Sequence, residues 1–366
     1  MQFIGIDLHT NKFTCCYRDE RSADKRTETF DLNEAGLAAF SGTLTADTHV
    51  LVEATITTFS FVRLFKDRVK EVIIANTYEL KQISLARTNT DKLCRLIKMQ
   101  VLSGEQTACP VTLPPVEIQE LRSLFSTYRL YKKQNAQLKN RIHSLLKEQL
   151  YGFTQEEIFD KRSRARIRGL SPGTALNFQV NQLLDPPPRE RVPERDEADV
   201  EALKEQVLVQ GEPFMREIGI LTSMKGISVF TAIAIIADVI EVSRFKNSKH
   251  NTRYLRSAPK VSNSNTSTSI RGTNKQGRKL AATLLTQSLN HVLDSSLKLR
   301  RWYDRLCEYK KAGLVRTGLR RRVLAEIYQM LKKGEYHYAR DAKKHEAKMV
   351  AYKKLLKSQT LLQKSA

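Results

Sequence analysis

The sequence has few cysteines, and their spacing argues against two kinds of scaffold. There are five, an odd number, and no two of them have the Cys-x-x-Cys spacing that is typical of a structural zinc site. The seven histidines are scattered singly along the chain. The pattern argues against a disulfide framework and against a zinc site, and it is typical of proteins from a reducing compartment.

A long apolar run and a secretory leader are also missing. The longest apolar stretch, residues 227–242, is shorter than the roughly 18 residues of a membrane span, and polar and acidic residues interrupt it. The segment after Met1 has no basic region followed by a long apolar core. We therefore expect a soluble protein of the cytoplasm with no membrane partner.

Acidic residues are scarce in one part of the chain only. The net charge is +23, and residues 214–366 contain 32 Lys and Arg against 10 Asp and Glu, whereas residues 1–105 contain 14 of each sign. A basic block of this kind favours binding to a polyanion through counterion release, and nucleic acid is the polyanion we expect. A merely solvated basic surface remains the alternative.

The first hundred residues alternate between strand and helix patterns. Apolar residues at the strand period, with turn residues between them, predict three strands, a helix capped by Asn33, a strand, a helix and a further strand. The predicted strands are residues 2–9, 13–17, 25–32, 49–54 and 71–75. This order favours an α/β layer, most simply a mixed sheet with helices packed on it.

Three acidic residues of this region are candidate metal ligands. Asp7 and Glu53 stand near the ends of the first and fourth predicted strands, and Asp91 stands at the start of a helix. If the two strands are neighbours, the three carboxylates can converge, and they then repel one another unless a cation lies among them. Mg²⁺ prefers such oxygen ligands and suits phosphodiester cleavage. For each acid alone, a solvated strand-end or N-cap carboxylate remains the alternative.

Residues 106–213 have the pattern of a helical arm. Apolar side chains recur at alternating spacings of three and four, which predicts a heptad seam with Asn135 at an a position. The seam consists of Leu121, Leu124, Tyr128, Tyr131, Asn135, Leu138, Ile142 and Leu145. A Pro-rich hinge at residues 186–193 precedes a second helix. We expect a coiled-coil arm of two antiparallel helices that joins dimers or tetramers, with a partnerless intramolecular hairpin as the alternative.

The basic third, residues 214–338, begins with a helix, a tight turn at Lys225 and Gly226, and an apolar helix. This pattern resembles a helix-hairpin-helix, whose exposed backbone N–H groups receive a phosphate, although Ser228 replaces the usual second glycine. The basic residues 339–366 form either a helix or a frayed tail.

A polar loop inside the basic third carries a candidate nucleophile. Serines of such loops usually form turns, but a serine framed by cations can attack phosphorus, because the cations stabilise the developing negative charge. The cations that we expect around the serine, and on nucleic acid, are Arg253, Arg256, Arg271, Lys275 and Arg278.

Taken together, these motifs resemble one family, the Piv/MooV-type DEDD transposases and invertases of the 110 family of bacterial insertion sequences. The resemblance covers roughly residues 2–338. Its marks are the segments 5–9, 52–54, 87–93, 224–232, 244–245, 275–277 and 322–331, and Pro259 followed by Ser264.

This resemblance implies an RuvC/RNase H-like domain at residues 1–105 with a Mg²⁺-binding acidic tetrad, a coiled-coil arm at 106–213, and a mainly α transposase domain at 214–338. It also implies a nucleoid-associated site-specific recombinase that attaches DNA through a serine and is guided by a structured bridge RNA. Asp7, Glu53 and Asp91 match the first three acids of the tetrad. Ser264 best matches the serine, and Ser262 is the fallback.

The sequence departs from the family pattern at two places. Cys94 stands at the position of the fourth acid, and a neutral thiol is a poor Mg²⁺ ligand. In addition, residues 256–258 contain no glycine where the family commonly has one. Three hypotheses follow: an active DNA recombinase, a decayed copy that binds nucleic acid without recombining it, and a junction nuclease that uses the acidic domain alone.

Overall fold

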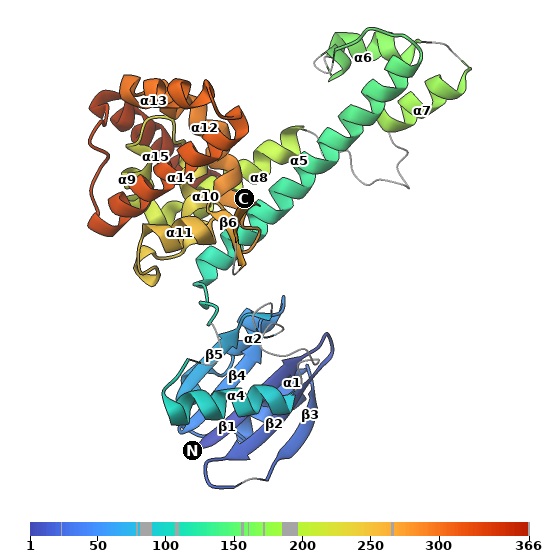
Figure 1. Ribbon diagram of the computed structural model, residues 1–366. Helices are drawn as coiled ribbons and strands as arrows, with labels where there is room; N and C mark the ends of the chain where they lie inside the picture. Colours follow the sequence, from blue (N-terminus) through green and yellow to red (C-terminus); the bar gives the residue numbers. More distant parts are fainter. Residues whose placement is uncertain are drawn as a thin grey trace. The chain divides into compact units, whose positions relative to one another are not determined.

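The computed structural model describes residues 1–22, 24–77, 80, 90–106, 110–154, 157–159, 161–170, 173–184, 197–264 and 267–364, with the backbone alone for 159, 161–162, 164, 197, 260–264, 267–271 and 360–364. Contacts divide the chain into two compact units, Met1–Pro115 and Val116–Ala366, and each is described by itself (Figure 1). Over these described ranges, no helix is both long and apolar enough to cross a membrane.

The N-terminal unit is built on a five-stranded mixed sheet. Its elements are β1 (Gln2–Leu8), β2 (Lys12–Asp19), β3 (Arg26–Asp31), α1 (Glu34–Gly42), β4 (Thr48–Glu53), α2 (Thr58–Arg63), η1 (Lys66–Arg68), β5 (Glu71–Ala75) and α4 (Thr90–Ser103). The strand order is β3-β2-β1-β4-β5. Strand β4 runs parallel to β1 and β5, and β2 runs antiparallel to β1 and β3. The predicted mixed sheet and its element order are confirmed.

Helices cover both faces of this sheet (Figure 1). On one face, Ile6 of β1 packs in a cluster with Phe40 of α1 and Phe61 of α2. On the other face, Phe3 of β1 packs with Leu93 of α4. Side chains of a strand alternate between the two faces, so the sequence of β1 supplies an apolar residue to each layer.

The C-terminal unit is helical apart from one β-hairpin. Its elements are α5 (Val116–Glu148), η2 (Glu157–Phe159), α6 (Lys161–Arg168), α7 (Ala175–Leu184), α8 (Glu197–Gln210), η3 (Glu212–Phe214), α9 (Met215–Thr222), α10 (Val229–Val239), η4 (Val242–Arg244), α11 (Ser248–Tyr254), β6 (Pro259–Ser264), β7 (Ser267–Thr273), α12 (Leu280–Leu293), α13 (Leu297–Cys307), α14 (Ala312–Lys333) and α15 (Ala342–Lys364).

The long helix α5 contributes to two separate cores. Its N-terminal part buries Leu121 and Phe125 in the main core, next to Val207 of α8. Its C-terminal part buries Ile142 and Leu145 in a smaller core with α6 and α7. Both ends of the predicted heptad seam are therefore covered within the chain, and the predicted proline hinge lies outside the described residues.

The apolar helix α10 forms the centre of the main core. Ile233 and Ile235 are fully buried there, and helices α5, α8, α9, α12, α14 and α15 contribute buried side chains to the same core. The C-terminal residues belong to this core, because α15 buries Tyr352 and Leu356. The Tyr352 hydroxyl donates a hydrogen bond of 2.7 Å to the Leu208 carbonyl of α8. Of the two alternatives for the basic tail, the structure has the helix.

Candidate functional site

Two of the predicted acids lie at the same edge of the N-terminal sheet. Strands β1 and β4 are parallel neighbours, with Ile6 opposite Val52, so Asp7 and Glu53 are the next residues along the two strands. The carboxyl ends of parallel strands meet at one edge. Asp7 is partly exposed, and its Oδ2 lies 3.4 Å from Nε2 of His9.

The third acid, Asp91, faces cations instead of the other two carboxylates. Its Oδ1 accepts a 2.7 Å hydrogen bond from Nη2 of Arg18 on β2, and its Oδ2 lies 3.0 Å from Nη2 of Arg95 and 3.9 Å from Nζ of Lys25. Burial alone would raise the pKa of Asp91, but Arg18, Arg95 and Lys25 outweigh it and lower that pKa below its ordinary value.

The structure therefore does not bring the three carboxylates together. Across the described part of the chain, no group of three His, Cys, Asp or Glu residues is placed to hold a metal ion. The physical reason is that Asp91 stands in the first turn of α4, level with Arg18 of the neighbouring strand, and this ion pair satisfies its charge.

Cys94, which the resemblance places at the position of the fourth acid, belongs to the interior. Its thiol is fully buried and donates a hydrogen bond to the Phe3 carbonyl, with 3.2 Å between Sγ and O. Burial raises the pKa of this thiol to about 12, so it remains protonated at neutral pH. Helix α4 approaches β1 closely here, because a Cβ on Gly5 would lie 2.3 Å from the Cys94 nitrogen.

The donor set fits Mg²⁺ in part. Asp7 and Glu53 supply hard carboxylate oxygens at a common edge, which is the chemistry that Mg²⁺ requires. Asp91 could join them only after exchanging its contact with Arg18, and the protonated thiol of Cys94 offers no suitable ligand.

The predicted order of a helix, a turn at Lys225 and Gly226, and an apolar helix is present from α9 to α10. Gly226 has φ of +95°, which favours glycine, and Lys225 is exposed beside it. Ser228 is the N-cap of α10, where its hydroxyl accepts a hydrogen bond of 3.1 Å from the Thr231 N–H. The serine that replaces the usual glycine therefore stabilises the start of the second helix.

The candidate serines lie on the β6–β7 hairpin. Ser264 is the last residue of β6 and pairs with Ser267, and Ser262 pairs with Ser269. Their side chains, and that of Arg271, lie outside the described residues. The five residue steps from Pro259 to Ser264 span roughly 17 Å at the rise of a β-strand.

The expected cations surround the foot of this hairpin rather than its tip. Arg253 and Arg256 precede β6, and Lys275 and Arg278 follow β7. These four cations therefore stand near the paired residues Pro259 and Thr273, five residue steps along β6 from Ser264.

A basic cavity of about 360 Å³ opens at the foot of the hairpin. Its cationic lining residues are Arg122, Arg129, Arg256, Arg278 and Lys279. The sequence predicted Arg256 and Arg278 as nucleic-acid contacts. It did not predict the other three, which are Arg122, Arg129 and Lys279. The missed signal was the pair Arg122 and Arg129 beside the apolar seam of α5. In the sequence, this pair resembles an ordinary solvated helix face.

Asp238 is the buried acid of this cavity. Its carboxylate is fully buried, lies 2.9 Å from Nε of Arg278 and accepts a 2.8 Å hydrogen bond from the Ala281 N–H at the start of α12. Arg122 donates to the Ala237 carbonyl at 2.7 Å. Burial, and then the neighbouring Arg278, lower the pKa of Arg122 to about 10. The crowded cations therefore favour a bound anion.

The backbone before β6 is held in an unusual conformation. Arg256 has φ of +51°, in the left-handed region that favours glycine. Two contacts hold it: Arg256 Nε donates to the Gly277 carbonyl at 2.6 Å, and Arg320 Nε donates to the Ser257 hydroxyl at 3.0 Å.

Models of known protein families match residues in both units of the chain. A model of DEDD transposases of the IS110 type, described as a transposase, matches residues 4–150, and a model described as "Transposase IS116/IS110/IS902 family" matches residues 219–304. A comparison with curated proteins finds no match. The mixed sheet, the basic helical unit and these matches define a DNA transposase. The chain belongs to the IS110 family of insertion-sequence transposases.

Proposed function

We propose that this transposase is a site-specific recombinase of the RuvC/RNase H-like type, which cleaves and rejoins DNA through attack of a hairpin serine on phosphorus. Ser264 is the proposed nucleophile and Ser262 the alternative. In the attack, the serine oxygen bonds to phosphorus, its proton leaves, and the DNA 3′ or 5′ oxygen departs, so that the phosphodiester is exchanged and not hydrolysed.

The observation that carries the proposal is the basic cavity at the foot of the serine hairpin. Arg129 and Lys279 are exposed there, and Arg278 is half-exposed although it pairs with Asp238. Such a cluster binds DNA phosphates. The roughly 17 Å between foot and tip corresponds to about five base pairs of duplex rise, so the cavity holds a phosphate at that distance from the attacked one.

The acidic edge is the proposed Mg²⁺ site, with Asp7 and Glu53 as its ligands, and Asp91 joins them only when it exchanges its contact with Arg18. When bound, Mg²⁺ supplies positive charge that polarises a phosphoryl oxygen. The contribution of the chain is to place Asp7 and Glu53 at the ends of adjacent parallel strands, and to hold Asp91 charged beside Arg18.

The proposed partners are DNA, a structured guide RNA and further copies of the chain. The basic charge of the C-terminal unit supports both nucleic acids. The middle of the predicted seam supports self-association into a dimer or tetramer, because Leu138 is only half-buried there.

A covalent-adduct assay tests the proposal. Purified full-length protein is incubated with Mg²⁺, end-labelled DNA of the element ends and RNA from the flanking region, and denaturing gels then detect protein–DNA adducts. We expect adducts from the wild type and from Ser262→Ala, and none from Ser264→Ala or Asp7→Ala. Hydrolysed DNA without adducts, in amounts indifferent to both serines, would instead identify the junction nuclease.

A second candidate function is nucleic-acid binding without recombination. The buried, protonated thiol of Cys94 favours it, because the tetrad is one carboxylate short. A wild type that binds the DNA and RNA but forms no adduct, together with a Cys94→Asp variant that forms adducts, would establish the decayed copy.

A further inference from the structure

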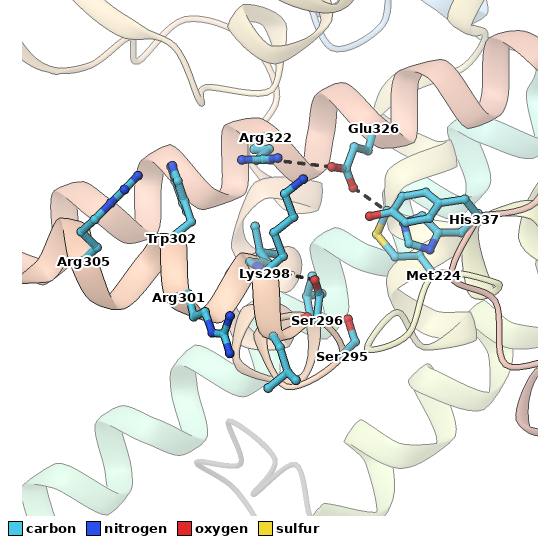
Figure 2. Close-up of a pocket in the computed structure, with 14 residues that line it drawn as sticks. Met224, Ser295, Ser296, Lys298, Arg301, Trp302, Arg305, Arg322, Glu326 and His337 are labelled. Carbon is cyan, nitrogen blue, oxygen red and sulfur yellow. Dashed lines mark hydrogen bonds and ion pairs between the residues drawn. The ribbon is translucent and has the colours of Figure 1, made fainter.

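The C-terminal unit contains a second cavity, separate from the serine hairpin. It has a volume of about 710 Å³ and lies between the α9–α10 turn, the end of α12, helices α13 and α14, and the segment after α14 (Figure 2). Sites for small molecules have volumes of about 300–1,000 Å³, so the cavity can hold a nucleoside phosphate.

Aromatic rings line this cavity. Trp302 of α13 is partly buried, and the guanidinium of Arg322 lies 5.5 Å from its ring centroid. Tyr338 is 85% exposed, and its ring centroid is 4.3 Å from that of His337. Both rings line the same cavity, and the face of either ring is suited to stacking against a planar group.

The charge of the cavity is strongly positive. Lys298, Arg301 and Arg305 of α13 line it, and in the described ranges none of these three has a carboxylate within 4.0 Å. In Figure 2 these side chains project from α13, the helix that also carries Trp302. These cations are available to a ligand that carries negative charge.

The carboxylate in the lining, that of Glu326, already has two basic side chains beside it. Glu326 lies 3.8 Å from Nε of Arg322 and 3.7 Å from Nε2 of His337, and these contacts are drawn in Figure 2. The contact with Glu326 holds Arg322 over the ring of Trp302. The second contact of Glu326 holds His337, whose ring lies beside that of Tyr338. The acid thus positions two of the groups that line the cavity and does not cancel the charge of α13.

We propose that this cavity binds an unpaired nucleotide of a single-stranded nucleic acid, with the base against Trp302 and Tyr338 and the flanking phosphates on Lys298, Arg301 and Arg305. A base paired inside a duplex cannot enter a recessed cavity, whereas an unstacked base can. The inference rests on the proposed function in that the chain handles nucleic acid, but it does not use the serine or the acidic edge.

The test uses Trp302 as its own reporter, because it is the chain's single tryptophan. The full chain is titrated at fixed salt with a single-stranded oligonucleotide of RNA or DNA, with a blunt duplex, with an abasic strand and with a mononucleotide. We expect the single strand to quench the emission saturably, and the abasic strand and the duplex to leave it nearly unchanged. Comparison of the RNA and DNA strands identifies the source of the nucleotide.

Variants separate stacking from charge. By anisotropy of a labelled single strand, Trp302→Leu and Tyr338→Ala should each weaken binding by roughly 5- to 150-fold. Tyr338 is exposed, so its removal tests the inference even if Trp302→Leu does not fold. The double change Arg301→Gln and Arg305→Gln should weaken binding to strands with and without a base. The matched control, Lys353→Gln with Lys354→Gln, removes two exposed charges of α15 and should weaken binding less.

The outcomes distinguish this inference from the proposed function. The inference is overturned if single strands leave the Trp302 emission unchanged and the Trp302 and Tyr338 variants bind single strands as tightly as the wild type does. It is also overturned if a mononucleotide binds as tightly as the single strand. Either result leaves the serine chemistry untouched if adducts still form. Conversely, quenching by single strands in a protein that forms no adduct supports the cavity and counts against the recombinase.

Discussion

The Arg18 guanidinium and the Asp91 carboxylate are 2.7 Å apart and link β2 to the first turn of α4. Both side chains are largely buried, with exposed fractions of 11% and 20%. An ion pair with this little exposure is screened weakly by solvent. It thus competes directly with any metal ion that would use Asp91.

Replacement of Arg18 should therefore strengthen Mg²⁺ binding. In Arg18→Gln, the carboxylate of Asp91 loses a bound cation but keeps a hydrogen-bond donor nearby. We expect Mg²⁺ to bind about tenfold more tightly than to the wild type, which corresponds to about 1.4 kcal/mol. Isothermal titration calorimetry and the Mg²⁺-dependent shift in Tm measure the effect without reference to activity.

Arg26→Gln is the matched control for this experiment. Arg26 lies on the neighbouring strand β3, is exposed and pairs with Glu28 instead of Asp91. Its replacement should leave Mg²⁺ affinity unchanged. Equal affinities of the wild type and Arg18→Gln would remove Asp91 from the proposed ligand set.

The same ion pair predicts a pH dependence of stability. Because Arg18 and its neighbours lower the pKa of Asp91 in the folded protein below the ordinary value of 3.8, the charged carboxylate stabilises the fold above that pH. The contribution is lost as the pH falls through the lower, folded-state pKa. The Tm of the wild type should exceed that of Asp91→Asn at pH 7, and the difference should shrink below about pH 4.

Thermal melts between pH 7 and pH 2.5 measure this difference. Asp67→Asn serves as the reference, since the Asp67 side chain is 86% exposed and its contact with Lys66 is long, at 3.9 Å. The reference should differ little from the wild type at every pH. If the difference in Tm between the wild type and Asp91→Asn stays constant down to pH 2.5, the ion pair does not have this role.

Restoring the fourth acid should carry a cost in stability. In Cys94→Asp, a carboxylate replaces a thiol that is fully buried and donates to the Phe3 carbonyl. The new group cannot donate when ionised, and we expect a loss of about 2–4 kcal/mol in the free energy of unfolding. Cys94→Ser, whose hydroxyl can still donate to that carbonyl, should lose less.

Mg²⁺ tests whether the restored acid joins a metal site. If Asp7, Glu53 and residue 94 share an ion, millimolar Mg²⁺ should raise the Tm of Cys94→Asp more than that of the wild type. Urea unfolding with and without Mg²⁺ gives the two free energies. Equal Mg²⁺ effects on both proteins would place residue 94 outside any metal site.

Local patterns of the sequence predicted most of the N-terminal unit. The strand period of residues 2–9 indicated β1, and Asn33 is the N-cap of α1, where it accepts a 2.8 Å hydrogen bond from the Gly36 N–H. These features depend on neighbours in the chain, and such features are visible in a sequence. The position of Asp91 was missed because Arg18, its partner, is 73 residues away.

The same limit explains the two cavities. The heptad seam of α5 was recognised, but nothing local indicates that Leu121 and Ile142 enter different cores. The lining of the second cavity runs from Met224 to Tyr338, and only the tertiary fold brings these residues together. The cations at the foot of the hairpin were predicted as a group, but their distance from Ser264 depends on the pairing of β6 with β7.

Asp238 should be essential for the stability of the C-terminal unit. Asp238→Ala leaves Arg278 next to Arg122 without its carboxylate and removes the acceptor of the Ala281 N–H. We expect a loss of about 2–4 kcal/mol in the free energy of unfolding, measured by urea denaturation. Asp294→Ala is the control, because Asp294 pairs with Arg300 at the surface and should contribute less than about 1 kcal/mol. Equal losses in the two variants would contradict the importance of burial.

The cavity at the foot of the hairpin should determine part of the salt dependence of DNA binding. Arg129 and Lys279 line it and are exposed, and in the described part of the chain neither pairs with a carboxylate. In Arg129→Gln and Lys279→Gln, affinity for duplex DNA should fall uniformly across sequences. The slope of log K against log salt should decrease by about one for each lost phosphate contact.

Arg256→Gly removes a third cation of this cavity and is chosen over alanine, since glycine tolerates the φ of +51° at this position. This change should lower the slope of log K against log salt in the same way, without altering the backbone conformation at this position. Lys310→Gln, which removes an exposed charge of the same unit beside Tyr309, is the control and should leave the slope unchanged. Fluorescence anisotropy of a labelled duplex, measured between about 50 and 200 mM salt, gives each slope. If all three cavity variants keep the wild-type slope, the cavity does not contact DNA phosphates, and the support that it lends to the proposed recombinase is lost.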